Sequence, residues 1–300
     1  MYTAAVPHIN GKFLYYAFIA GGKEILQNQK EINRINVFPV NDNDTGTNLA
    51  STVRAVIDNI RPHKSFKTTV GNIADAALIG ARGNSGVIFA QFLHGLSRET
   101  LNKPVITLPE FAESVKRSIP YIYDAIANPV EGTMLTVIRD WSDFLMARKE
   151  AIHDFKKVII ESIAVLEKSL AETTVKLKAL NKTGFVDAGA KGFVLFIKGI
   201  IDFIINRNVR SLVAPAEESI SLTHTEEITT EEITHRYCTE AIIKNLKISI
   251  PQLQSILNSN GDSVVVAGSE NICRIHVHSN NPAELFHQLN DTGTITFQKV

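Results

Sequence analysis

The 300-residue sequence has little cysteine and no excess of charge of either sign. Two cysteines, Cys238 and Cys273, are too few for a disulfide framework and are typical of a chain kept in a reducing, cytoplasmic compartment. Lys and Arg together number 31, as do Asp and Glu, so no overall positive field is available to collect nucleic acid or an anionic membrane. We therefore expect no nucleic-acid partner.

Long hydrophobic runs are also missing. The apolar stretch at residues 13–20 is too short to span a bilayer, and its pattern continues past Gly22 at helical spacing, which predicts a buried first helix. The sequence contains no Walker A run, Gly-x-x-x-x-Gly-Lys-Ser/Thr, which excludes the commonest phosphate-binding loop. With 44% hydrophobic and 21% charged residues, the composition is that of a globular protein long enough for two domains.

Residues 1–206 predict an all-α domain. Apolar residues recur three or four positions apart, most clearly from Phe155 to Leu177, and no alternating strand pattern appears. We expect a helical bundle or barrel, with a kink or break near Pro120. The predicted helices span residues 49–60, 73–80, 85–96, 109–127, 133–147, 155–177 and 192–205.

The pattern changes twice further along the chain. Residues 207–235 are acidic and lack a sustained apolar period, which predicts a linker. Residues 236–300 predict strands and helices in the order β-α-β-β-α-β, which is typical of a small ferredoxin-like α+β domain. Because the last predicted strand, 294–300, has no polar closure, we expect the chain to be cut from a longer protein.

The segment from Asn36 to Asn48 has the pattern of a metal and phosphate site. Asp42 and Asp44 lie two residues apart in a turn-rich stretch and can converge on one hard cation such as Mg²⁺. The residues that follow lead into a helix start, where free N–H groups favour a phosphate. An Asx-rich turn that caps a helix is the alternative for the two aspartates alone. The phosphate-facing candidates are Thr45, Gly46, Thr47 and Asn48.

Three further glycine-rich breaks lie between predicted helices, at residues 80–86, 128–133 and 183–192. In the first, a polar residue would cap the next helix and leave N–H donors facing an oxyanion, although a tight helix–helix turn explains the glycines equally well. Alternate connections of an up-and-down bundle lie at the same end, so four such loops can line one nucleotide pocket. The candidates that these breaks add are Asn84, Ser85, Gly132, Thr133, Asp187 and Gly189.

The strand predicted at 271–279 carries two histidines on one face. His276 and His278 alternate with Cys273 and its apolar neighbours, so Cys273 is expected in a core. Two such histidines with a cysteine from a neighbouring strand suit Zn²⁺. A surface histidine pair with a buried cysteine is the simpler interpretation.

Four of these motifs, in this order, resemble a known nucleotide-binding module. The runs at 36–48, 80–86, 129–133 and 186–189 are similar to the module shared by bacterial fatty acid kinases and the L subunit of dihydroxyacetone kinase. Residues 236–300 resemble the middle domain that follows this module in fatty acid kinases. The resemblance implies an antiparallel eight-helix barrel that binds ATP and Mg²⁺ at one end.

The resemblance also implies roles for single residues. Asp42 and Asp44 match the family's Mg²⁺ ligands and are the expected catalytic residues, while Asn36 stands roughly where dihydroxyacetone kinases carry a further metal-binding Asp. Asn41 and Asn43 depart from the family's Pro-Asp-Gly-Asp pattern, but Asn tolerates a left-handed backbone. The phosphate-facing matches are Thr47, Asn48, Asn84 and Ser85, and the implied Zn²⁺ ligands are Cys238, His276 and His278.

We expect the Zn²⁺ to be structural, because residues 236–300 form a domain of only about 65 residues, in which core burial is marginal. The resulting hypothesis is an ATP-dependent kinase subunit that phosphorylates the carboxylate of a fatty acid presented by a DegV-type lipid-binding protein or fused domain. The alternatives are a dihydroxyacetone-type kinase subunit, against which residues 236–300 speak, and a non-catalytic nucleotide-binding scaffold. The oligomeric state stays open, with a homodimer as one option.

Overall fold

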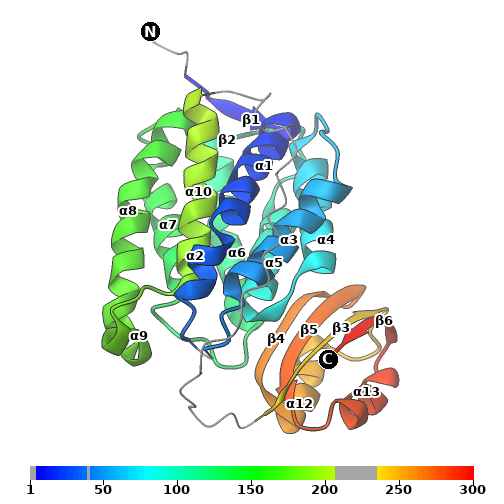
Figure 1. Cartoon of the computed structure of the whole chain (residues 1–300). Coiled ribbons are helices and arrows are strands. Elements are labelled where there is room, and N and C mark those ends of the chain that lie inside the picture. Colours follow the sequence, from blue (N-terminus) through cyan, green and yellow to red (C-terminus); the bar gives the residue numbers. More distant parts are fainter. Residues whose placement is uncertain (1–4, 39–40, 207–234) are drawn as a thin grey trace.

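A computed structural model describes residues 5–38, 41–206 and 235–300 (Figure 1). Helices packed side by side form a first domain, and a four-stranded sheet with two helices lies against one end of it. The linker predicted at 207–235 lies outside the described residues, apart from His235. None of the described helices is long and apolar enough to cross a membrane.

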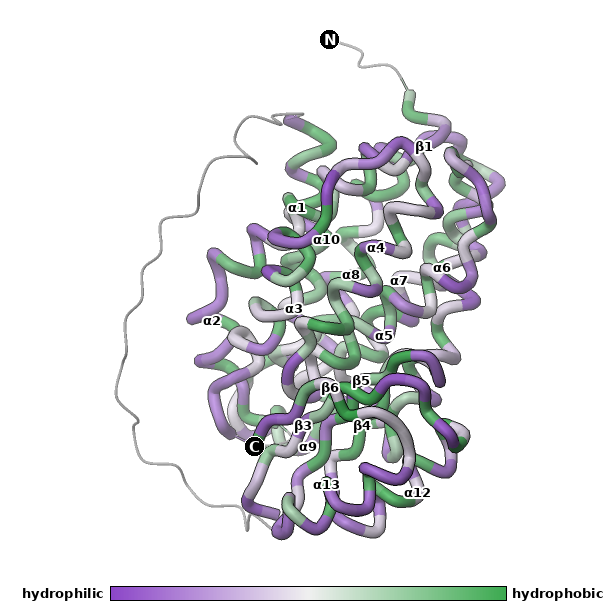
Figure 2. The backbone as a smooth tube through the Cα atoms, turned by 90° about the vertical axis from the view of Figure 1, so that its right-hand side faces the viewer, coloured by the Kyte–Doolittle hydropathy of each residue, from purple (hydrophilic) through white to green (hydrophobic). Residues whose placement is uncertain are grey.

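The helices of the first domain follow the apolar period of the sequence, and hydrophobic and hydrophilic stretches alternate along them in Figure 2. The stripe that begins at Phe155 is buried along α8, as predicted. The described helices are α1 (Gly11–Gln27), α2 (Gln29–Arg34), α3 (Thr45–Asn59), α4 (Phe66–Gly80), α5 (Gly83–Glu99), α6 (Leu108–Asp124), α7 (Met134–Arg148), α8 (Phe155–Lys176), α9 (Lys178–Thr183) and α10 (Ala188–Asn206).

Two predictions for this domain are wrong in detail. The domain is not purely helical, because β1 (His8–Asn10) pairs with β2 (Val105–Thr107) in a small antiparallel sheet. Strands of three residues are too short to show an alternating pattern. Pro120 does not break α6. It lies on the exposed side of the helix, where the carbonyl that it leaves without a partner can reach water.

The second domain has the element order that the sequence predicts. Its sheet is antiparallel with the strand order β4-β5-β3-β6. Cys273 and its alternate neighbours on one face form a hydrophobic core with the two helices, which confirms the buried position expected for Cys273. The elements are β3 (Tyr237–Lys244), α12 (Ile250–Asn260), β4 (Gly261–Ser269), β5 (Ile272–Ser279), α13 (Pro282–Asn290) and β6 (Thr294–Lys299).

The other face of the sheet packs on the first domain. Val265 and Ala267 of β4 belong to the hydrophobic core of the helices. Backbone hydrogen bonds from Ala127 N to Val264 O (3.2 Å) and from Val266 N to Ala125 O (2.9 Å) join β4 to the chain that follows α6. The two domains therefore share a core, and the side chains of β3 and β5 on this face are brought against the helix ends.

Candidate functional site

A small pocket lies where the two domains meet. It encloses about 50 Å³, which has room for metal ions and phosphate oxygens. Pockets that hold a whole small molecule enclose roughly 300 Å³ or more, so a nucleoside would lie outside this cavity. The residues that line it are Asn36, Asp42, Asp44, Thr45, Asn48, Gly83, Asn84, Ser85, Cys238, His276 and His278.

The acidic loop forms one wall. Asn43 adopts a left-handed backbone (φ +53°), as Asn tolerates, and this brings Asp42 and Asp44 close together. Asn36 Nδ2 donates a hydrogen bond to Asp42, and Asn36 Oδ1 accepts one from the Thr45 hydroxyl. Asn36 thus holds the loop against the start of α3. A direct bond from Asn36 to a metal stays a prediction.

The two carboxylates repel each other. Desolvation and the nearby Asp44 raise the pKa of the Asp42 carboxyl to about 7. Asp42 is exposed at the rim, where water offsets part of the desolvation, so we base the direction of the shift on the repulsion as well. A bound divalent cation would replace this repulsion with attraction, which makes the pair a fitting Mg²⁺ site.

Binding of Mg²⁺ should therefore depend on pH. A proton competes with the metal for Asp42, so we expect the apparent Mg²⁺ affinity to fall about tenfold per pH unit below about pH 7. Titrations of Mg²⁺ in the presence of a non-hydrolysable ATP analogue, from pH 8 down to pH 5.5, measure this. An affinity that stays constant over this range would show that Asp42 is ionised throughout.

The first turn of α5 forms the opposite wall. Gly83 adopts φ +55°, and a Cβ there would lie 2.0 Å from Asn48 Nδ2, so only glycine fits. The amides of a helix's first turn have no partner within the helix, and those of Asn84 and Ser85 belong to residues that line the pocket. Asn84 Oδ1 is buried without a hydrogen-bond partner. This wall has the donors and the unused polar atom that suit a phosphate and its metal.

Two of the phosphate-facing candidates point elsewhere. A Cβ on Gly46 would lie 2.2 Å from the backbone oxygen of Gln29, so this glycine lets α2 pack closely on α3. The Thr47 hydroxyl accepts hydrogen bonds from Gln29 and Asn33 of α2, both at 3.0 Å. Neither residue lines the pocket, whereas Thr45 and Asn48 do.

The loops before α7 and α10 meet through Asp187. Asp187 Oδ1 accepts hydrogen bonds from Met134 N (3.1 Å) and Ala190 N (2.7 Å), so one buried carboxylate caps both helices. A Cβ on Gly189 would lie 3.3 Å from Ser85 Oγ, which places this loop beside the pocket. Like Gly132 and Thr133, these residues do not line the pocket, and their contact with a cofactor stays a prediction.

Asp187→Ala should destabilise the first domain. It leaves two helix-terminal N–H groups without an acceptor in a buried place, which costs about 2 kcal/mol. Chemical denaturation measures the change in the free energy of unfolding. A loss below about 0.5 kcal/mol would contradict the double-capping role.

Two strands of the second domain complete the pocket. Cys238 pairs with His278 and Glu240 with His276 across β3 and β5, so these four side chains share the face toward the helices. One ligand atom from each of Cys238, His276 and His278 lies within 4.8 Å of the others. His276 is 2% exposed, and its Nε2 is buried without a hydrogen-bond partner. These residues fit a Zn²⁺ ion in their number, type and spacing.

This position corrects two expectations. The histidines are not a surface pair, because His276 is buried beneath the first domain. A structural clip for a small core does not fit either, because the core of the second domain lies on the other face of the sheet. The cluster instead faces the acidic loop, in the same pocket as Asp42 and Asp44.

Sequence reasoning missed Glu240, which is 1% exposed. Burial alone raises the pKa of Glu240, but the hydrogen bond with His276, the Arg274 guanidinium and the Gly83 amide outweigh it and hold the pKa at about 2. The carboxylate is therefore ionised at neutral pH. Its alternation with Cys238 along the strand was the signal available in the sequence.

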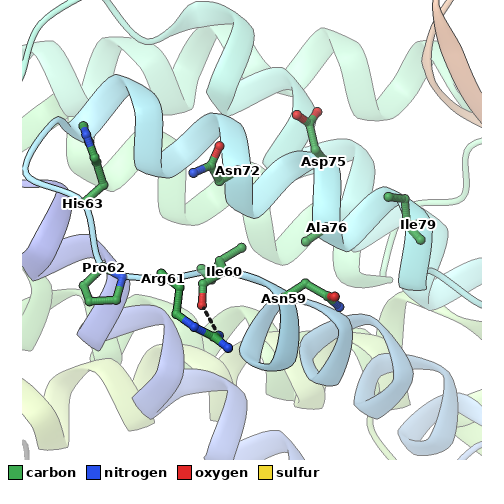
Figure 3. Close-up of a pocket in the computed structure, with 9 residues that line it drawn as sticks. All are labelled: Asn59, Ile60, Arg61, Pro62, His63, Asn72, Asp75, Ala76 and Ile79. Carbon is green, nitrogen blue, oxygen red and sulfur yellow. Dashed lines mark hydrogen bonds between the residues drawn. The ribbon is translucent and has the colours of Figure 1, made fainter.

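A larger hollow of about 600 Å³ lies elsewhere on the first domain, between the end of α3 and α4. In Figure 3, Asn72 and Asp75 extend from α4 above the 59–63 segment, and Arg61 turns to the carbonyl of Ile60. Its polar groups do not converge on one point. We therefore place the functional site at the pocket between the domains.

The helical domain and its acidic loop identify the class of protein. Residues 39–202 match the DAK2 domain, and the chain belongs to this family. Residues 234–300 match the family described as the FakA-like middle domain of fatty acid kinase. The chain therefore joins a DAK2 domain to a middle domain of the fatty acid kinase type.

The similar proteins include longer chains. An uncharacterised protein of Staphylococcus saprophyticus is 32% identical over 311 residues, and one of Staphylococcus epidermidis is 30% identical over 308 residues. Both matches cover 98% of this chain and 55% of the relative, so the chain spans about half the length of these curated relatives. Dihydroxyacetone kinase from C. freundii, solved with AMP-PNP and Mg²⁺, aligns with a TM-score of 0.48 and 16% identity over 63% of this chain and 33% of that one.

Proposed function

We propose that this chain is the nucleotide-binding part of an ATP-dependent kinase that phosphorylates the carboxylate of a fatty acid. The observation that carries the proposal is the convergence of two aspartates and two helix N-termini on one pocket. Membership of the DAK2 family and the match of the second domain to a fatty acid kinase middle domain support the same reaction.

In this proposal, Asp42 and Asp44 hold Mg²⁺ on the phosphates of ATP. Thr45 and Asn48 at the start of α3, and Asn84 and Ser85 at the start of α5, face the phosphate oxygens. Helix N-termini carry partial positive charge and free N–H groups, so they stabilise negative charge that develops during transfer. Mg²⁺ neutralises the remaining phosphate charge when bound.

A carboxylate acceptor fits the side chains of the pocket. It is already an anion, so its attack on the γ-phosphorus needs no general base. The Cys238, His276 and His278 cluster lies across the pocket from the acidic loop and offers a metal, proposed to be Zn²⁺, that would attract such an anion. In the proposal the acyl chain is held by a partner, a DegV-type lipid-binding protein or a domain of that type.

The test is the formation of acyl phosphate. The chain is mixed with ATP, Mg²⁺ and a DegV-type protein loaded with fatty acid, and the product is trapped with hydroxylamine as the hydroxamate. We expect product only when ATP, Mg²⁺ and the loaded protein are all present. Phosphorylation of free dihydroxyacetone in place of the fatty acid would contradict the proposal, as would Mg²⁺-dependent ATP binding without any transfer.

A further inference from the structure

Glu240 joins the second domain to the phosphate-facing turn of the first. Its Oε1 accepts a hydrogen bond of 2.7 Å from the backbone N–H of Gly83, 157 positions away in the sequence. Its Oε2 accepts one of 2.7 Å from Arg274, and Arg274 donates another, of 3.3 Å, to the backbone oxygen of Ile79. The pair therefore contacts the end of α4 and the start of α5, on both sides of the turn that separates them.

The start of α5 has no cap of its own. Its N-cap residue, Arg82, makes no side-chain capping bond, and Gly83 has a left-handed backbone that glycine alone adopts freely. The first amides of a helix need acceptors from outside the helix, and a carboxylate is a favourable one. Glu240 supplies this acceptor to Gly83, while Asn84 and Ser85 next to it face the pocket.

The charge of Glu240 is balanced where it stands. A carboxylate beside a phosphate site would repel the phosphate, but Arg274 lies 2.7 Å away with both side chains almost fully buried, at 2% and 1% exposure. The Arg274 guanidinium also lies 4.7 Å from the centre of the Phe297 ring, which holds it from the other side. The pair can thus orient the turn without adding net negative charge to the pocket.

We infer that Glu240 and Arg274 are positioning residues, which fix the Gly83 turn for phosphate binding and make the second domain necessary for the full nucleotide affinity of the first. The inference rests on the proposed nucleotide site. Neither side chain needs to touch the nucleotide, because both act through the backbone of the turn. A turn that is already ordered loses less conformational freedom when phosphate binds, so binding is tighter.

Two double variants of the chain test this inference. Glu240→Met with Arg274→Met removes both charges and the acceptor for Gly83, while Glu240→Gln with Arg274→Met removes both charges and keeps an acceptor oxygen. Neither leaves a buried charge without its partner, which would unfold the protein for another reason. The control is Gln254→Ala, which removes a 2.7 Å hydrogen bond to the Asp124 oxygen at the same domain interface, away from the pocket.

Two measurements are made on each folded variant: the affinity for an ATP analogue with Mg²⁺, and the rate of amide hydrogen exchange over residues 81–86. In the methionine variant we expect about tenfold weaker binding and about tenfold faster exchange, whereas the glutamine variant and the control stay within about threefold of the wild type. Equal affinities or equal exchange rates in the methionine and glutamine variants would overturn the inference. An equal loss of affinity in Gln254→Ala would also overturn it.

Failure of the proposed function would look different. In that case the wild-type chain itself would not bind the analogue, and the inference about affinity would fall with the function. The difference in exchange rate between the two double variants would still be seen, because it depends only on the hydrogen bond between Glu240 and Gly83.

Discussion

Asp42→Ala and Asp44→Ala should each reduce Mg²⁺-dependent nucleotide turnover about a thousandfold or more, with little change in stability. A metal that bridges phosphate oxygens contributes several kcal/mol to transition-state stabilisation, and each aspartate supplies part of its coordination. The two side chains lie in a loop at the rim of the pocket, where the loss of a carboxylate disturbs no core packing. Turnover with fatty-acid-loaded carrier and the melting temperature are the two measurements.

Asp58→Ala is the matched control. Asp58 is an exposed carboxylate near the far end of α3, the same helix that Asp44 precedes, and it does not line the pocket. This variant should keep wild-type turnover. Near-normal turnover in the Asp42 and Asp44 variants, or an equal loss in Asp58→Ala, would remove the basis for the metal assignment.

The second large effect concerns Cys238, His276 and His278. The purified chain should carry about one Zn²⁺, and replacing both histidines with alanine should lower this to about a tenth or less, because a single remaining thiolate does not hold the ion. Elemental analysis measures the content. His287→Ala, on the exposed side of α13, is the matched histidine control and should keep its metal.

The two cysteines provide an internal comparison for the same site. Burial raises the pKa of the Cys273 thiol to about 12, so iodoacetamide should not modify Cys273 in the folded protein, with or without metal. Cys238 should react only after a chelator has removed the metal. Metal that survives the loss of both histidines, or a Cys238 that reacts equally with and without chelator, would contradict the assignment.

Local pattern was enough to predict much of the fold. The stripe from Phe155 to Leu177 corresponds to α8, and the alternation around Cys273 correctly separates the core face of β5 from the other face. The three-residue strands β1 and β2 were missed because they are shorter than the period that would identify them. The continuity of α6 through Pro120 depends on which side of the helix meets solvent, which the proline alone does not indicate.

The candidate site divides in the same way. Short segments that combine turn residues with a helix start predicted the acidic loop and the Gly83 turn, and the structure brings these together. The approach of His276 to the acidic loop depends on how one domain docks on another, which no spacing in the sequence encodes. The contact between Glu240 and Gly83, 157 residues apart, was unpredictable for the same reason.

The most direct test of the site is a calorimetric titration of the chain with a non-hydrolysable ATP analogue, with and without Mg²⁺. We predict one binding site per chain, with an affinity that falls at least about tenfold when Mg²⁺ is removed and equally when Asp42 and Asp44 are both replaced by alanine. Binding that is unchanged by EDTA and by the double replacement would show that the nucleotide does not bind through the acidic loop. That result would contradict the placement of the functional site between the two domains.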